Sequence, residues 1–185
     1  MKRNPKATVR STQVVFRGQL FRVRRDWVEE PALHGGPHRP AAMREVVEHT
    51  GSVVVLPVFP DGRILLVRQY RYAAGDFLWE LVAGHIEPDE RPLAAARREL
   101  REETGYRTRR FEPLVTFFPT PGFLTEQMHL YRATQLRAGR ARPEADEEFE
   151  VRAFTRRELE RMLRQGKLRD GKTLVGVLLE LRRRA

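Results

Sequence analysis

Three glutamates, Glu99, Glu102 and Glu103, stand close together in the stretch Arg-Glu-Leu-Arg-Glu-Glu-Thr-Gly-Tyr at 98–106. On an α-helix, residues three and four apart lie on the same face, so these carboxylates would crowd one strip of surface. Their mutual repulsion and the unfavourable helix dipole together cost about 1 kcal/mol. A local preference violated in this way often marks a functional site. Clustered carboxylate oxygens suit Mg²⁺, which keeps water or phosphate oxygens for its other positions.

An ordinary solvated helix face, on which neighbouring arginines neutralise the glutamates, is the alternative that the spacing leaves open. Arg98 can pair with Glu102 one turn further on and fix its rotamer. A helix is predicted over 90–104, because Pro92 falls in the first turn and Gly105 follows the end. The glutamates lie beside its apolar stripe, which consists of Leu93, Ala96 and Leu100.

A fixed order of residues surrounds the glutamates. The pattern glycine, five residues, glutamate, seven residues, Arg-Glu-aliphatic-x-Glu-Glu-x-Gly-hydrophobic is matched without a gap by Gly84, Glu90, Arg98, Glu99, Leu100, Glu102, Glu103, Gly105 and Tyr106. It resembles the Nudix box, a loop-helix-loop that binds Mg²⁺ and hydrolyses nucleoside diphosphates linked to another group. The resemblance implies an α/β fold: a Nudix-type α/β/α sandwich with a mixed β-sheet and an N-terminal antiparallel sheet.

The residues on either side of the box narrow the resemblance. Arg68-Gln-Tyr-Arg71 precedes the box and Pro121 follows it, an arrangement similar to the ADP-ribose pyrophosphatase branch. Two residues depart from this branch: Val82 stands where proline is usual, and His85 where an aliphatic residue is common. Both departures leave the glutamates intact and bear on the choice of substrate.

The resemblance also implies a metal site. Glu99 and Glu103 would bind Mg²⁺ directly, with the backbone carbonyl of Ala83 nearby and Mn²⁺ as an alternative ion. Glu102 would bind a second ion or bridge to the attacking water. Gly84 would let the backbone approach the metal closely, because it has no Cβ.

Substrate contacts implied by the resemblance fall on Arg68, Arg71, Glu80, Gly84 and Pro121. Arg71 would contact the diphosphate, and Glu80 would hold polar groups of the substrate. The branch usually forms dimers through its N-terminal sheet, so a homodimer is expected. Trp27 or Phe21, from the same or the partner subunit, would then stack on the adenine.

Diphosphate hydrolysis needs a water lined up behind one phosphorus and neutralisation of the leaving oxygens. In the branch that the chain resembles, a general base comes from a late loop, here the acidic segment 143–149. By its distance before Phe149 we choose Glu147, with Glu148 and Glu144 as alternatives. A solvated loop without a catalytic role also stays open. The expected catalytic residues are therefore Glu147, Glu102 and Arg98.

Hydrophobic patterning predicts the remaining elements. Strands are predicted at 13–16, 20–29, 44–48, 51–59, 63–72, 109–118, 127–133 and 149–154, and further helices at 156–164 and 173–182. Residues 77–83 lead into the box. We divide the chain into a flexible basic N-terminus (1–12), an N-terminal β segment for dimerisation (13–49) and a hydrolase domain (50–185).

The chain carries a net charge of +10 and contains no cysteine. The absence of cysteine excludes disulfides, thiolate metal sites and cysteine nucleophiles. The positive charge is compatible with nucleic-acid binding, but no Lys/Arg run is interleaved with aromatic residues, so no nucleic-acid partner is expected. Without a long apolar segment, the protein is expected to be cytoplasmic and to lack membrane contact.

Together these features predict a Mg²⁺-dependent hydrolase that cleaves ADP-ribose to AMP and ribose 5-phosphate. Alternative substrates are another nucleotide sugar or dinucleotide, such as GDP-mannose, FAD or NADH. A Nudix-like protein that binds a nucleotide or RNA without cleaving it is the alternative from a different class. Loss of a box carboxylate would favour that alternative, and none is lost.

Overall fold

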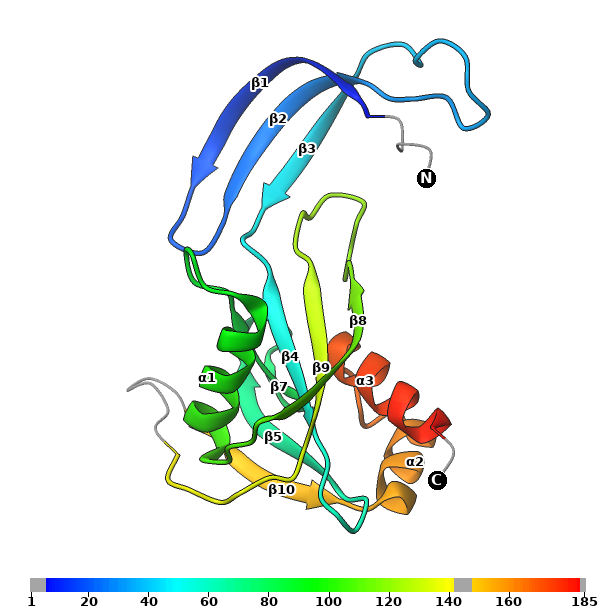
Figure 1. Cartoon of the computed structure of the whole chain (residues 1–185). Coiled ribbons are helices and arrows are strands. Elements are labelled where there is room, and N and C mark those ends of the chain that lie inside the picture. The colour runs from blue at the N-terminus through cyan, green and yellow to red at the C-terminus, as the bar shows by residue number, and fades with distance from the viewer. Residues whose placement is uncertain (1–5, 142–147, 184–185) are drawn as a thin grey trace. The chain divides into compact units, whose positions relative to one another are not determined.

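The computed structural model describes residues 6–141 and 148–183. The chain forms two units, and Figure 1 labels most of their elements. The first unit consists of the described residues up to Thr50 together with Thr120–Glu126. The second consists of Gly51–Pro119 and the described residues from Gln127 onward. No helix in these described ranges is long and apolar enough to cross a membrane.

The first unit contains an antiparallel sheet in the order β1 (Thr8–Arg17), β2 (Arg22–Glu29) and β3 (Ala42–Glu48). β1 begins inside the segment that we expected to be flexible up to residue 12. That expectation is wrong for residues 8–12, because their backbone pairs with β2 from Thr8 opposite Glu29 onward. Arg10 also forms an ion pair with Glu29, at 2.8 Å between Nη2 and Oε2.

A segment from much later in the sequence, Thr120–Glu126, completes this unit along β3. The Val47 N–H donates to the Phe123 carbonyl at 2.8 Å, and the Thr125 N–H donates to the Val47 carbonyl at 3.0 Å. The His49 N–H donates to Thr125 Oγ1 at 3.0 Å. Pro121 therefore belongs to the first unit.

The second unit is built around β4 (Ser52–Pro57), whose residues are all buried. β4 lies in a mixed sheet of order β7-β4-β9-β8, antiparallel to β7 (Val82–His85) and parallel to β9 (Met128–Thr134), with β8 (Arg110–Phe117) at the edge. A second, antiparallel sheet has the order β10 (Glu150–Phe154), β5 (Ile64–Arg71) and β6 (Asp76–Glu80). A short 3-10 helix, Tyr72–Ala74, follows β5.

Helices cover both faces of β4. Its alternate residues Val53 and Val55 pack in one cluster with Leu100 of α1 (Pro92–Thr104). Val54 and Leu56 pack in the other cluster, which includes residues of α2 (Arg156–Arg164) and α3 (Gly171–Arg182). Successive side chains of a strand point to opposite faces, so the continuous apolar run of β4 serves two cores. The predicted α/β sandwich with a mixed sheet is confirmed.

Residues 77–83, which lead into the box, contribute to β6 and β7, and these two strands belong to different sheets. The residue between them, Leu81, donates its N–H to Thr173 Oγ1 of α3 at 2.7 Å instead of joining a ladder. The pattern of apolar residues gives no sign of this change of sheet, because Leu81 and its neighbours on both sides are buried.

The predicted helices begin at slightly different residues from those observed. α1 starts at Pro92 and not at residue 90, because Arg91 before the proline is extended, as the proline ring favours. α3 starts at Gly171, ahead of residue 173, because the Asp170 side chain caps it and accepts from the Thr173 N–H at 2.9 Å.

Candidate active site

The end of β7 and one face of α1 bring Glu99 against Gly84. A Cβ built on Gly84 would lie 1.9 Å from Glu99 Oε1 and 2.1 Å from its Cδ, so any larger residue would displace this carboxylate. α1 is held at this close distance by Ala95, Ala96 and Leu100, which are fully buried in the core cluster shared with β4. Residue 84 must therefore be glycine because the Glu99 side chain approaches its backbone closely.

Glu103 lies one turn beyond Glu99 and faces the same strand. Its side chain is buried, with 4% of the residue exposed, and Oε1 accepts from the Ala83 N–H at 3.4 Å. The charge of Glu103 also contributes to raising the pKa of Arg71, after the larger effects of the hydrogen bond to Glu80 and of burial, which opposes it. Glu99 and Glu103 thus both approach the backbone of β7, and Arg71 lies close enough to Glu103 for the two charges to interact.

Arg98 neutralises the crowded carboxylates. Its Nη1 lies 2.6 Å from Glu99 Oε1 and 3.4 Å from Glu102 Oε2, which is the pairing expected for Glu102. Nη2 donates to Glu90 Oε2 and to the His85 carbonyl, both at 2.9 Å. The hydrogen bond to Glu90 is the largest cause of the raised pKa of Arg98. The guanidinium therefore connects α1 to the loop that precedes it.

A buried ion cluster surrounds Glu80, of which 1% is exposed. Its Oε1 accepts from Arg71 Nε at 2.8 Å, and its Oε2 accepts from Arg71 Nη2 at 2.7 Å and from Lys172 Nζ at 2.6 Å. Lys172 also contacts Asp170 Oδ1 at 2.9 Å. Glu80 and Lys172 thus fix the orientation of Arg71. Both oxygens of Glu80 already have partners within the protein. Contact of Glu80 with the substrate stays a prediction.

Burial on its own would raise the pKa of Glu80. The hydrogen bond from Arg71 and the charge and hydrogen bond of Lys172 outweigh burial, so the pKa is lowered and the carboxylate is ionised at neutral pH. The Arg71 side chain itself remains 41% exposed. Its Nη1 has no partner among the described residues and is left for an anion.

The other predicted site residues belong to several parts of the chain. Arg68 pairs with Glu150 of β10 at 3.3 Å, and its guanidinium lies 5.1 Å from the centre of the Phe77 ring. Trp27 and Pro121 are in the first unit, and Trp27 is 50% exposed. Glu147 and Glu144 lie outside the described residues, whereas Glu148 is described and exposed.

The donor set fits Mg²⁺. Within the described residues no three His, Cys, Asp or Glu side chains gather into a closed metal centre. Glu99 and Glu103 instead offer two carboxylates that both face β7, next to Gly84, which has no Cβ to block an ion. One or two carboxylates completed by substrate phosphates and water is the set that Mg²⁺ commonly takes.

Sequence reasoning missed three members of this site. Glu90 stands before the helix, so helical spacing gave no reason to pair it with Arg98, although both belong to the fixed pattern. Lys172 lies 92 residues from its partner Glu80, and Asp170 reaches this cluster through its contact with Lys172, so no local signal linked either residue to Glu80.

Comparison with known proteins places the chain in a family. A family model described as "NUDIX domain" matches residues 48–174. An ADP-ribose pyrophosphatase from Bacillus subtilis (strain 168) is 32% identical over 179 residues, which cover 96% of this chain and 93% of that protein. An ADP-ribose pyrophosphatase from Mycobacterium tuberculosis (strain ATCC 25618 / H37Rv) is 41% identical over 139 residues, 75% of this chain and 64% of that protein.

Other matches differ in the substrate that they name. A GDP-mannose pyrophosphatase from Cronobacter sakazakii (strain ATCC BAA-894) is 35% identical over 142 residues, 71% of this chain and 74% of that protein. A solved structure described as "Crystal structure of ADP compounds hydrolase" superposes with a TM-score of 0.78 at 21% identity and covers 97% of this chain and 94% of that one. This structural match shows the shared fold.

Proposed function

Because the chain belongs to the NUDIX domain family and is a Nudix hydrolase, we propose that it hydrolyses the diphosphate bond of ADP-ribose, in a Mg²⁺-dependent reaction, to AMP and ribose 5-phosphate. The observation that carries this proposal is the pair of carboxylates, Glu99 and Glu103, set against the backbone of Ala83 and Gly84. ADP-ribose is favoured because the match to the Bacillus subtilis enzyme covers nearly the whole chain, including the N-terminal sheet.

In this proposal Glu99 and Glu103 hold Mg²⁺ or, as a substitute, Mn²⁺. The bound ion would supply neutralisation of the diphosphate oxygens and activation of water. Arg98 keeps the Glu99 carboxylate in its rotamer and compensates the repulsion from Glu102. Glu102, which pairs with Arg98 and Arg101, is proposed as the ligand of a second ion or as a hydrogen-bond acceptor for the attacking water.

Arg71 binds the diphosphate. The Nε and Nη2 of Arg71 donate to Glu80, so the guanidinium is oriented before the substrate arrives. Its Nη1 would then donate to a phosphate oxygen of the substrate. We retain Glu147 as the general base that accepts the proton of the attacking water, with Glu148 and Glu144 as alternatives. Arg68 and the loop of Pro121 are proposed as further substrate contacts.

The proposal is tested by initial rates on ADP-ribose, GDP-mannose, UDP-glucose, FAD, NADH and diadenosine polyphosphates, each with Mg²⁺ and with excess chelator. We expect ADP-ribose to give a kcat/KM at least about tenfold above the others, with AMP as product, because a site that hydrogen-bonds one substrate rejects analogues that leave its polar groups unpaired. Chelator should abolish turnover, and turnover that survives it would exclude the metal assignment.

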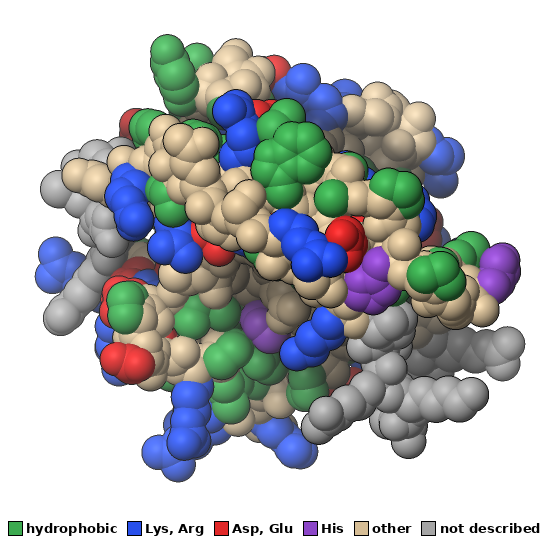
Figure 2. Space-filling view, turned by 90° about the horizontal axis from the view of Figure 1, so that it is seen from above, with side chains coloured by type: hydrophobic (Ala, Val, Ile, Leu, Met, Phe, Trp, Pro, Cys, Tyr) green, Lys and Arg blue, Asp and Glu red, His purple; other side chains and the backbone are tan. Residues whose placement is uncertain are grey.

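GDP-mannose is the second candidate substrate, because a GDP-mannose pyrophosphatase is also similar to this chain. A higher kcat/KM for GDP-mannose would leave the roles of Glu99 and Glu103 intact. It would show that the proposed substrate is wrong. Absence of turnover on the whole panel would favour the non-catalytic nucleotide- or RNA-binding alternative. One observation argues against RNA as the ligand. On the face shown in Figure 2, Lys and Arg side chains are scattered among hydrophobic ones and form no continuous stripe.

We include a homodimer formed through the N-terminal sheet in the proposal. That sheet carries exposed apolar side chains on all three strands, among them Val9, Phe16, Trp27 and Met43, a pattern typical of protein interfaces. In such a dimer Trp27 or Phe21 would stack on the adenine. Sedimentation equilibrium should give twice the mass of the 21.6 kDa chain. A monomer at micromolar concentration would contradict this part of the proposal.

A further inference from the structure

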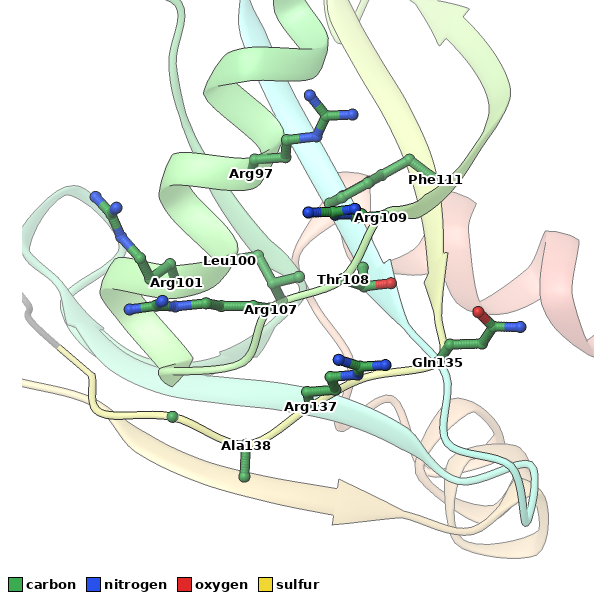
Figure 3. A pocket seen from close by; sticks show the side chains of 11 residues that line it. Arg97, Leu100, Arg101, Arg107, Thr108, Arg109, Phe111, Gln135, Arg137 and Ala138 are labelled. Atoms are coloured by element: carbon green, nitrogen blue, oxygen red, sulfur yellow. The ribbon is translucent and has the colours of Figure 1, made fainter.

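A pocket rich in arginine lies on the side of α1 away from Glu99. It has a volume of about 840 Å³ and opens between the helix, the segment before β8 and the segment after β9 (Figure 3). Five arginines line it, namely Arg97, Arg101, Arg107, Arg109 and Arg137. At about 100° per residue, Arg97 stands about 200° around the helix from Glu99. The pocket is therefore separate from Glu99, and its one contact with the active-site carboxylates among the described residues is the pair of Arg101 and Glu102.

Most of these arginines have no acidic partner in the described part of the chain. Arg101 pairs with Glu102, with Nη2 at 3.0 Å from Oε1. The Arg97 Cζ lies 5.9 Å from the centre of the Phe111 ring. No carboxylate among the described residues forms an ion pair with Arg97, Arg107, Arg109 or Arg137. The helix dipole accounts for Arg101 in the last turn but leaves Arg97, Arg109 and Arg137 without an explanation.

The backbone holds two of these charges opposite each other. Arg107 and Arg137 exchange both backbone hydrogen bonds, each at 2.9 Å, so they form a directly opposed pair. Like charges at opposed positions repel, which destabilises the pair unless an anion lies between them. A bound anion would relieve this repulsion.

The segments that carry the arginines lie close together, and a hydrogen bond joins two of them. Thr108 Oγ1 donates to the Thr134 carbonyl at 2.5 Å. A Cβ on Gly139 would lie 2.8 Å from the Gly105 carbonyl, and one on Gly105, where φ is +74°, would lie 2.6 Å from the Ala141 nitrogen. The arginines are thus mounted on a tightly packed frame, as a preorganised binding site requires.

We propose that this pocket binds a small molecule that carries two or more phosphate groups. Guanidinium groups match phosphate oxygens in geometry and charge, and several are provided at once. The volume lies within the range of small-molecule sites and the lining is concave, which fits a compact ligand better than a nucleic-acid strand. The inference goes beyond the proposed function, and its test needs no turnover.

The test uses inorganic tripolyphosphate, titrated calorimetrically into the protein at low salt with excess EDTA, so that no divalent ion is present. The variant Arg107→Gln/Arg109→Gln is compared with Arg157→Gln/Arg164→Gln on α2, which removes the same charge from exposed residues outside the pocket. We expect the pocket variant to lose at least about tenfold in affinity and the control less than about twofold. Arg109→Gln alone serves if the double variant does not fold.

Three results would overturn the proposal: no binding by the wild type at millimolar tripolyphosphate, equal losses in both variants, or unchanged affinity in the pocket variant. Tighter binding of single-stranded RNA that depends on the same arginines would also overturn it in favour of a nucleic-acid surface. ATP distinguishes the two sources of such a ligand. If ATP binds more tightly than tripolyphosphate and Phe111→Leu removes the difference, the ligand is a nucleotide; equal affinities identify an inorganic polyphosphate chain.

Discussion

Replacement of Glu103 by Gln should lower kcat/KM on the leading substrate by about 10³-fold while the protein stays folded. Glutamine keeps the shape and can still lie beside the Ala83 N–H, but it removes one of two carboxylates next to β7. Charge stabilisation by a bound metal supplies several kcal/mol to such reactions, and each 1.36 kcal/mol corresponds to a factor of ten in rate. Initial rates with saturating Mg²⁺ measure the loss.

The matched control for Glu103→Gln is Glu112→Gln on β8, where the carboxylate is half exposed and pairs with Arg183 at 3.0 Å. This control should keep its activity within about twofold, since exposed ion pairs contribute little. Thermal unfolding of both variants separates loss of chemistry from loss of fold. Full activity in Glu103→Gln would show that the metal is not held by this carboxylate.

Glu80→Gln should lower the free energy of unfolding at neutral pH by about 3 kcal/mol. The substitution leaves Lys172, which is 10% exposed, and the half-buried Arg71 with one fewer anionic partner, and breaking one side of a buried ion pair costs about 3–5 kcal/mol. We take the lower value because Arg71 reaches solvent and Lys172 keeps Asp170. Urea unfolding followed by circular dichroism measures the difference.

The same substitution predicts a pH dependence. The folded pKa of Glu80 is lowered below its ordinary value of 4.5, so its ionised form stabilises the fold above that pH, and this stabilisation is lost as the pH falls through the folded pKa. The gap between wild type and Glu80→Gln should therefore shrink in acid. The exposed pair of Arg156 and Glu160 supplies the control, and Glu160→Gln should cost less than about 1 kcal/mol. A pH-independent gap would contradict the assignment.

The sequence anticipates those parts of the molecule that depend on local periodicity. The apolar run of β4 and the stripe of α1 are visible in single segments, because burial on one or both faces dictates residue type along the element. The Glu99 and Glu103 pair follows from the same helical spacing. For these residues, local pattern and final structure agree.

Contacts between distant segments were not predictable in this way. The change of partner at Leu81 depends on the Thr173 hydroxyl, and the support of Arg71 depends on Lys172. The arginines of the pocket come from three separate segments and look like scattered surface charges in sequence. Only folding brings them together, so composition alone suggested a uniformly basic protein.

The late segment that completes the N-terminal unit has a consequence for synthesis on the ribosome. His49 and its partner Thr125 are 76 residues apart, so β3 emerges from the ribosome long before its neighbour exists. At about 5–20 residues per second the nascent chain waits about 4–15 s with an open strand edge and exposed aromatic residues beside it. Chaperone binding or premature pairing between neighbouring nascent chains would act during this interval, and slower translation of residues 50–125 would lengthen it.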